Sequence, residues 1–218
     1  MWNGGTMATA GNLVFQGDAD GKLSAYNAAT GERVWQFNAG LGIIAPPVTY
    51  AVDGKQYVSI LVGWGGASGF PSKYVNRGWK YGAQPRRLLT FALDAKAKLP
   101  ETAPPDMKVY ALDDPDLVLD ERLVAQGAAL YGNCIMCHGA NTISSGAPAP
   151  DLRESGIAFD RASFASLLRS GAMQSGGMPQ YDEFSEEQLD ALWMYIRAGA
   201  REALGKRKAG TDAAASSN

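Results

Sequence analysis

The chain has 218 residues, with 20 Lys and Arg against 22 Asp and Glu, so its formal net charge is −2. This length suits one large or two small domains, and 46% hydrophobic with 19% charged residues excludes a wholly disordered chain. The balanced charge gives no support for nucleic-acid binding, which needs a basic surface, and the longest apolar run, 57–64, is far shorter than the ~20 residues of a membrane-spanning helix.

Residues 1–94 contain short runs of β-branched and aromatic residues, separated by pairs that favour tight turns. Asp20-Gly21, Thr30-Gly31 and Asp53-Gly54 are such pairs, because glycine adopts the positive φ angles that two-residue turns need. Short antiparallel strands at this spacing indicate a β-sandwich, a β-barrel or the blades of a β-propeller. The runs predicted to be strands are 12–16, 22–26, 33–37, 48–52 and 56–60.

Three segments are predicted to lie outside the regular elements. The loop 69–87 carries aromatic residues among glycines, and either faces the C-terminal half or packs on its own surface. Residues 95–116 are rich in proline and poor in apolar residues, so they are predicted to form a semi-rigid linker. The tail 205–218 is small and polar and is predicted to be disordered.

The two cysteines and the only histidine lie within five positions, as Cys134-Ile135-Met136-Cys137-His138. A Cys-x-x-Cys-His run is the attachment motif of c-type haem, because two thiols on one helical turn can each add to a vinyl group while the imidazole supplies an axial nitrogen. A zinc site usually has four ligands, and a thioredoxin-like dithiol would not need His138. We therefore expect one covalent haem c held by Cys134 and Cys137, with His138 bound to its iron. A redox dithiol and a zinc site are the alternatives.

A methionine is the expected sixth ligand of the iron, since the chain has no second histidine. Met173 and Met178 lie in one glycine-rich loop, and Met194 lies in a stretch predicted to be helical. Met178 follows two glycines, which allow close approach to a flat cofactor, and precedes a proline that stiffens the turn. Met178 is therefore predicted to ligate the iron, with Met173 as the alternative and Met194 expected to pack in the core.

Residues 117–204 show the apolar periodicity of a small helical domain. A first helix is predicted over 117–131, running into the haem motif. A middle helix follows Asp160, which is a favourable N-cap residue. The last helix begins at a capping box formed by Ser185 and Gln188, and its apolar residues form one broad face.

This helical segment resembles the class I cytochrome c domains. Gly127 and Tyr131 are similar to the glycine and the aromatic residue at which the first helix of that family crosses the last. The resemblance also implies that the carbonyl of Pro150 accepts a hydrogen bond from His138 and so orients the imidazole.

The stretch 25–35, AYNAATGERVW, resembles the tryptophan-docking motif of the β-propellers that bind pyrroloquinoline quinone (PQQ). In that family an alanine, an acidic residue, a glycine and a tryptophan connect adjacent blades. Here Asn27 replaces the acidic residue and Trp35 is the tryptophan. With the segments 2–5 and 63–67 and a cytochrome in the expected order, nearly the whole chain resembles the C-terminal end of the quinohaemoprotein alcohol dehydrogenases of type II.

The resemblance implies an α+β multidomain chain. A partial antiparallel β-propeller segment is expected over 1–94, a proline-rich linker over 95–116, an all-α class I cytochrome c domain over 117–204 and a disordered tail over 205–218. A propeller needs at least ~4 blades of roughly 40–50 residues each, so residues 1–94 provide two at most. We therefore expect a truncated piece of a longer secreted enzyme, whose partner is the missing N-terminal portion of the propeller.

The expected function is that of a haem c electron-transfer module. It would accept electrons from the reduced quinone of a PQQ-dependent alcohol dehydrogenase and pass them to an external cytochrome, copper protein or quinone. The catalytic aspartate and calcium ligands of the family have no matching residues here, so no catalytic residue is assigned, and PQQ and calcium are not expected to bind to this chain alone. Haem attachment of this type implies a periplasmic location, although no signal peptide is visible.

Two other functions stay open. The first alternative is a free-standing c-type cytochrome whose β-rich half is a partner-binding adaptor without catalytic activity. The second is a dithiol redox protein, which would carry no haem. An exposed propeller edge also predicts poor solubility of the β-rich half.

Overall fold

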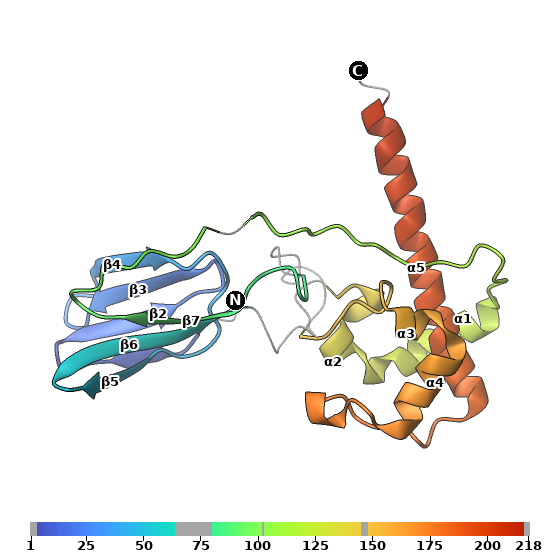
Figure 1. The fold of residues 1–218 in the computed structure, drawn as a ribbon, viewed down its shortest axis with the longest axis horizontal. Coiled ribbons are helices and arrows are strands. Elements are labelled where there is room, and N and C mark those ends of the chain that lie inside the picture. The colour runs from blue at the N-terminus through green and yellow to red at the C-terminus, as the bar shows by residue number, and fades with distance from the viewer. Residues whose placement is uncertain (1–3, 64–79, 102, 145–147, 216–218) are drawn as a thin grey trace.

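The computed structural model describes residues 4–63, 80–101, 103–144 and 148–215, with side chains as far as residue 205. Two β-sheets form the N-terminal half and helices form the C-terminal half, and an extended segment connects them (Figure 1). The expected α+β class, strands first and helices second, is confirmed. Residues 2–3 and 64–67 of the segments that resemble the propeller family, and residues 69–79 of the predicted loop, lie outside the described residues.

The first sheet is a four-stranded antiparallel meander in which each strand pairs with the next in sequence. Asn27 closes the last turn, because its side-chain oxygen accepts the backbone N–H groups of Ala29 and Thr30 at 2.9 and 3.3 Å. The first strand of this sheet, which is three residues long, was not predicted from the sequence. The strands are β1 (Thr6–Ala8), β2 (Leu13–Gly17), β3 (Lys22–Asn27) and β4 (Arg33–Asn38).

The second sheet has three antiparallel strands in the order β5-β6-β7. Asp53 and Gly54 form its hairpin turn with φ angles of 50° and 74°, the left-handed conformation that two-residue hairpins require. This turn was predicted, whereas the third strand was not. The strands are β5 (Val48–Val52), β6 (Lys55–Val62) and β7 (Arg87–Phe91).

The two sheets share one apolar core. Leu23 of β3, Ile60 of β6 and Ile43 of the connecting segment are almost fully buried, and Phe37 and Phe91 pack against them. Gly17 lies so close to Ile43 that a Cβ atom there would overlap with its side chain. The described strands form two open sheets and no closed ring, as expected for part of a propeller.

The C-terminal half is built from capped helices. Asp160 accepts the N–H of Ser163 at 2.7 Å, and Ser185 and Gln188 cap each other reciprocally at 2.9 and 3.2 Å, so both predicted helix starts are confirmed. The α-helices are α1 (Glu121–Leu130), α2 (Ile135–His138), α3 (Gly156–Phe159), α4 (Arg161–Ser170) and α5 (Glu186–Ala215), and the 3-10 turns are Tyr131–Asn133, Ala140–Thr142 and Gln174–Gly176.

Helices α1 and α5 cross in close contact at Gly127. A Cβ atom at this position would overlap with the backbone carbonyl of Ala191 and approach Tyr195, so only glycine permits this crossing. Next to it, the rings of Tyr131 and Tyr195 lie 5.1 Å apart. The glycine and the aromatic residue expected at the crossing of the first and last helices are therefore confirmed.

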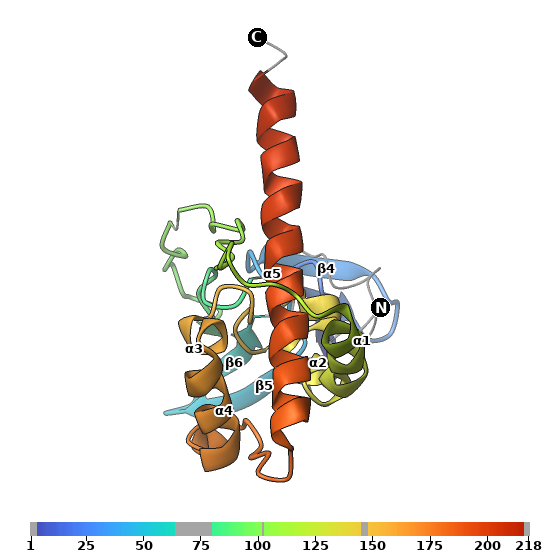
Figure 2. The same cartoon turned by 90° about the vertical axis from the view of Figure 1, so that its right-hand side faces the viewer.

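Helix α5 is longer than predicted. It continues to Ala215 and projects beyond the other helices (Figures 1 and 2), whereas the sequence predicted a disordered tail from residue 205. Alanine, lysine and arginine favour helix, and this segment extends a helix that is already formed, which avoids the cost of nucleation. Among the described residues, no helix is long and apolar enough to cross a membrane.

Candidate haem site

The two thiols and the imidazole of the haem motif lie on a single helical turn. The N–H of Cys137 and the N–H of His138 both donate to the carbonyl of Cys134, at 3.2 and 2.8 Å. Both cysteines are half-buried and form no disulfide, and Cys134 packs against the core of the helical half. The fold therefore gathers all three groups of the motif at one place.

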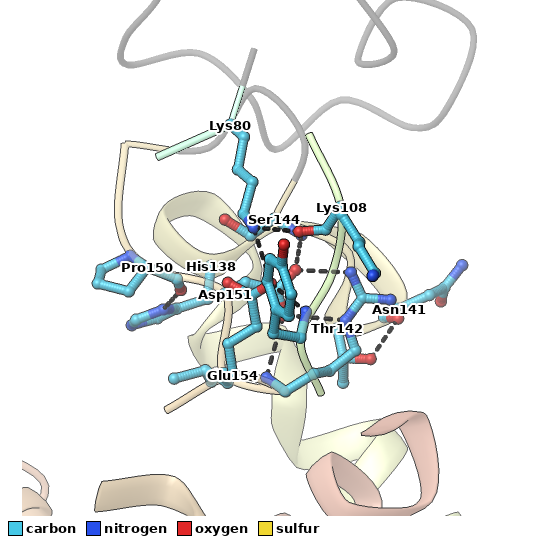
Figure 3. Close-up of polar contacts among 12 residues, drawn as sticks. Lys80, Lys108, His138, Asn141, Thr142, Ser144, Pro150, Asp151 and Glu154 are labelled. Carbon is cyan, nitrogen blue, oxygen red and sulfur yellow. Dashed lines mark hydrogen bonds and ion pairs between the residues drawn. The ribbon is translucent and has the colours of Figure 1, made fainter. Parts of the chain in front are cut away.

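The side chain of His138 is buried and oriented by one hydrogen bond. Its Nδ1 lies 2.8 Å from the carbonyl oxygen of Pro150, as Figure 3 shows, so the expected bond is confirmed. Burial holds the pKa of His138 below its ordinary value, which favours the neutral imidazole. Because a carbonyl only accepts, Nδ1 carries the proton, and the lone pair is left on Nε2, the tautomer that suits an axial ligand.

A buried ion pair supports the turn that carries Pro150. Arg153 donates to both carboxylate oxygens of Asp151, at 2.9 and 2.6 Å, and both side chains are almost fully buried. The N–H of Ala149 donates to the carbonyl of Cys137 at 3.0 Å, and the hydroxyl of Ser144 donates to the carbonyl of Ala149 at 2.9 Å. The Pro150 carbonyl thus belongs to a turn that is bonded to the haem motif through Ala149 and His138, and Figure 3 shows Pro150 beside His138.

A buried arginine of α5 adds a third support that the sequence did not reveal. Arg197 is fully buried and donates to the carbonyls of Leu112 and Leu152, at 2.8 and 3.0 Å. Its guanidinium lies 5.7 Å from the ring centre of Phe159. Burial lowers the pKa of Arg197 to about 10, so it remains a cation at neutral pH and binds the carbonyls on either side.

The candidate sixth ligands differ in their surroundings. Met178 is half-buried and packs against the same core cluster as Cys134, and its loop turns at Gly171 and Gly177, which have φ angles of 63° and 90°. Met173 is 47% exposed. Met194 lies half-buried on α5. The structure thus brings Met178, rather than Met173, into the cluster that contains a thiol of the motif.

The donor set fits a haem better than the two alternatives. Burial raises the pKa of Cys134 to about 11, whereas a redox-active dithiol needs a lowered thiol pKa, because the thiolate is the nucleophile. In the part of the chain that the structure describes, no group of three or more His, Cys, Asp or Glu side chains could hold a metal ion. A neutral imidazole, two thiols on one turn and a thioether in the same cluster match the ligands of a c-type haem.

Within the predicted docking motif, Ala25 is buried, Asn27 is half-buried and Trp35 is partly exposed. The side-chain oxygen of Asn27 accepts backbone N–H groups of the turn before β4. Trp35 is 39% exposed, and its ring contacts Phe91 edge-on at 5.4 Å.

Two family models match the chain in the predicted order. The β-propeller domain of the glucose, ethanol and alcohol dehydrogenases matches residues 1–58. The model described as cbb3-type cytochrome c oxidase subunit III matches residues 122–196, which include the haem motif.

Curated relatives match both halves at once. The quinohemoprotein alcohol dehydrogenase ADH IIB of Pseudomonas putida is 44% identical over 199 residues, which are 89% of this chain and 28% of the relative. The solved structure of ADHIIG from the same species has a TM-score of 0.74 at 38% identity, covering 94% of this chain and 29% of that one. The structure of the Comamonas testosteroni enzyme has a TM-score of 0.65 at 36% identity, covering 92% and 28%. The chain spans little more than a quarter of the length of these relatives.

Proposed function

We propose that this chain carries electrons from a reduced quinone cofactor to an external acceptor. The proposal rests on its homology to the C-terminal part of the quinohaemoprotein alcohol dehydrogenases. The observation that carries the proposal is the neutral, buried imidazole of His138, oriented by Pro150 beside two thiols on one turn. This arrangement is the one that a covalent haem requires.

Each residue of the site has a separate task in this proposal. Cys134 and Cys137 would anchor the porphyrin through thioether bonds, and His138 Nε2 and Met178 Sδ would hold its iron. A methionine ligand raises the reduction potential, which suits an acceptor of electrons from a reduced quinone. The haem, when bound, supplies the one-electron chemistry, while the chain orients the imidazole and excludes water from the core cluster around Cys134 and Met178.

We also propose that the β-rich half packs against further strands of a propeller. The side chains of Val48, Tyr50 and Val52 on β5 are 55%, 43% and 51% exposed, and an apolar edge strand of this kind needs a cover. The relatives carry quinohemoprotein in their names and are longer than this chain, so a complete propeller with its PQQ and calcium would be that cover. On the same similarity we propose a periplasmic location and a cytochrome, copper protein or quinone as the acceptor.

The alternative is a free-standing cytochrome whose β-rich half is an adaptor for an unrelated partner. Mixing the chain with a purified propeller polypeptide, PQQ and calcium separates the two functions. A complex whose haem becomes reduced when alcohol is added supports the dehydrogenase proposal. The absence of any complex favours the adaptor.

The haem assignment is tested by the optical spectrum after expression with haem-maturation machinery. We expect a c-type spectrum with a methionine-to-iron charge-transfer band in the parent, and loss of this band in Met178→Ala. Met173→Ala is the matched control and should retain the band. A haem-free parent would contradict the assignment and favour the dithiol. If Met178→Ala retains the band, the sixth ligand is another methionine, with Met173 the first candidate, and if the parent itself lacks the band, the iron has no methionine ligand.

A further inference from the structure

The two halves of the chain meet at a lysine that belongs to the β-rich half. Lys80 opens the turn 80–86, which runs directly into β7, and its N–H donates to the side chain of Gln84 at 2.9 Å. The ammonium of Lys80 lies 2.8 Å from a carboxylate oxygen of Glu154, which belongs to the helical half. Both side chains are mostly buried, with 18% and 22% of their surfaces exposed.

The connecting segment completes this contact. The same oxygen of Glu154 accepts the backbone N–H of Tyr110 at 2.6 Å, and the ammonium of Lys80 also donates to the carbonyl of Lys108. The ring of Tyr110 lies 5.5 Å from that ammonium, and Gln84 reaches the sulfur of Met107 at 3.2 Å. Three segments that are distant in sequence therefore converge on one ion pair.

Glu154 follows the turn that orients the haem ligand. Its N–H donates to the carbonyl of Asp151 at 3.1 Å, and Asp151 is held by Arg153 directly after Pro150. The N–H of Leu112 donates to the carbonyl of Arg153 at 2.9 Å. The contacts thus continue from Lys80 through Glu154 to the turn beside His138 (Figure 3).

Burial distinguishes this ion pair from an ordinary surface pair. The pair Lys55–Asp94 has the same 2.8 Å separation, but its side chains are 45% and 70% exposed. It also lies within the β-rich half, because Lys55 begins β6 and Asp94 follows β7. Exposed pairs are screened by water and contribute little, whereas removal of one partner from a buried pair leaves the other charge uncompensated. Lys80 and Glu154 are closer to the second case.

We propose that Lys80, Tyr110 and Glu154 form a polar junction that fixes the cytochrome domain in place against the β-sheets. The junction holds the connecting segment between the turn 80–86 and the turn that carries Pro150. Its use in keeping the haem at a constant distance from an electron donor rests on the proposed function. The junction itself is a property of the chain, and Lys80 and Glu154 are positioning residues rather than ligands.

Hydrogen–deuterium exchange of the full chain, followed by mass spectrometry, tests the junction. The amides of Tyr110 and Leu112 donate to Glu154 and to Arg153, so their exchange reports local opening. We expect Lys80→Met and Glu154→Gln to speed exchange in the segment 107–112 at least about fivefold. Glu154→Ala should have a larger effect, because it also removes the acceptor of the Tyr110 amide.

Two variants make the test specific. Lys80→Arg keeps the positive charge, so segment 107–112 should exchange at the parent rate. Lys55→Met removes an equal charge from the exposed pair, and it should leave the exchange of this segment unchanged. Peptides from 186–196 of α5 should exchange as in the parent in every variant. Parent-like exchange of 107–112 in Lys80→Met, or equal acceleration in Lys55→Met, would overturn the junction. The optical spectrum separately reports whether haem is attached, so failure of the haem assignment is distinguishable.

Discussion

At the scale of single residues, the turn that orients His138, the proposed axial ligand, contains a buried pair of opposite charges. His138 is oriented by the Pro150 carbonyl, and the next residue, Asp151, receives two hydrogen bonds from the Arg153 side chain. Opposite charges in a buried pair compensate each other's loss of hydration. Removal of one member of the pair should therefore lower the free energy of unfolding, because the other charge stays buried without a partner.

Replacing Asp151 by alanine should destabilise the helical half strongly. The guanidinium of Arg153 would remain buried without its partner, and such a loss typically lowers the free energy of unfolding by about 3–5 kcal/mol. Urea unfolding followed by helical circular dichroism measures the change. Asp94→Ala removes one partner of the exposed pair with Lys55 and should shift the midpoint much less. Equal midpoints for the two variants would contradict a structural role of the buried pair.

At the scale of elements, the contact between α1 and α5 positions the end of α1, which leads into the haem motif. Gly127 lies against the carbonyl of Ala191 without room for a Cβ atom. Directly after α1, the chain enters the turn of Tyr131 and then the motif at Cys134. A change in this crossing would therefore be transmitted to the thiols.

Gly127→Ala should separate the two helices. The added methyl group overlaps with helical backbone that cannot move aside, and overpacking of this kind costs roughly 1–3 kcal/mol. Thermal unfolding of the helical half measures the effect. Gly132→Ala is the matched control, because an added Cβ atom there meets no atom within 4 Å. A melting temperature of Gly127→Ala at or above that of Gly132→Ala would show that the crossing tolerates a side chain.

Local features of the elements were predictable from the sequence, whereas contacts between distant segments were not. The cap at Asp160, the box at Ser185 and the turn at Asp53 depend on neighbouring residues alone. By contrast, β7 exists because of its pairing with β6, across an intervening segment of more than twenty residues. Lys80 and Glu154 are 74 residues apart, so no spacing rule could have connected them.

The burial of Arg197 was equally invisible at the level of sequence. An arginine on an amphipathic helix normally extends into solvent, and only the fold shows that Leu112 and Leu152 offer it carbonyl oxygens. The candidate haem ligands were found because their residue types are rare in the chain and their chemistry is specific. Their supports consist of common residues, which become informative only once the chain is folded.

At the scale of the whole molecule, the β-rich half has an exposed apolar edge strand, β5. Among the described strands, β5 pairs with β6 on one side only, and every residue of β5 is exposed. Unpaired backbone groups beside apolar side chains are a template for further strands. We therefore expect this edge to pair with the proposed propeller strands or with a second copy of the chain.

Placing charge on this edge should suppress association of the isolated chain. We expect the parent to form concentration-dependent assemblies in sedimentation velocity experiments, and the double variant Val48→Lys, Val52→Lys to remain largely monomeric, because lysine on an edge strand opposes pairing. Leu93→Lys is the control, since Leu93 is fully exposed but lies outside the strands. If propeller strands are the natural cover, the double variant should also weaken binding to a propeller polypeptide. A parent that stays monomeric at all concentrations would show that the edge is protected without a partner.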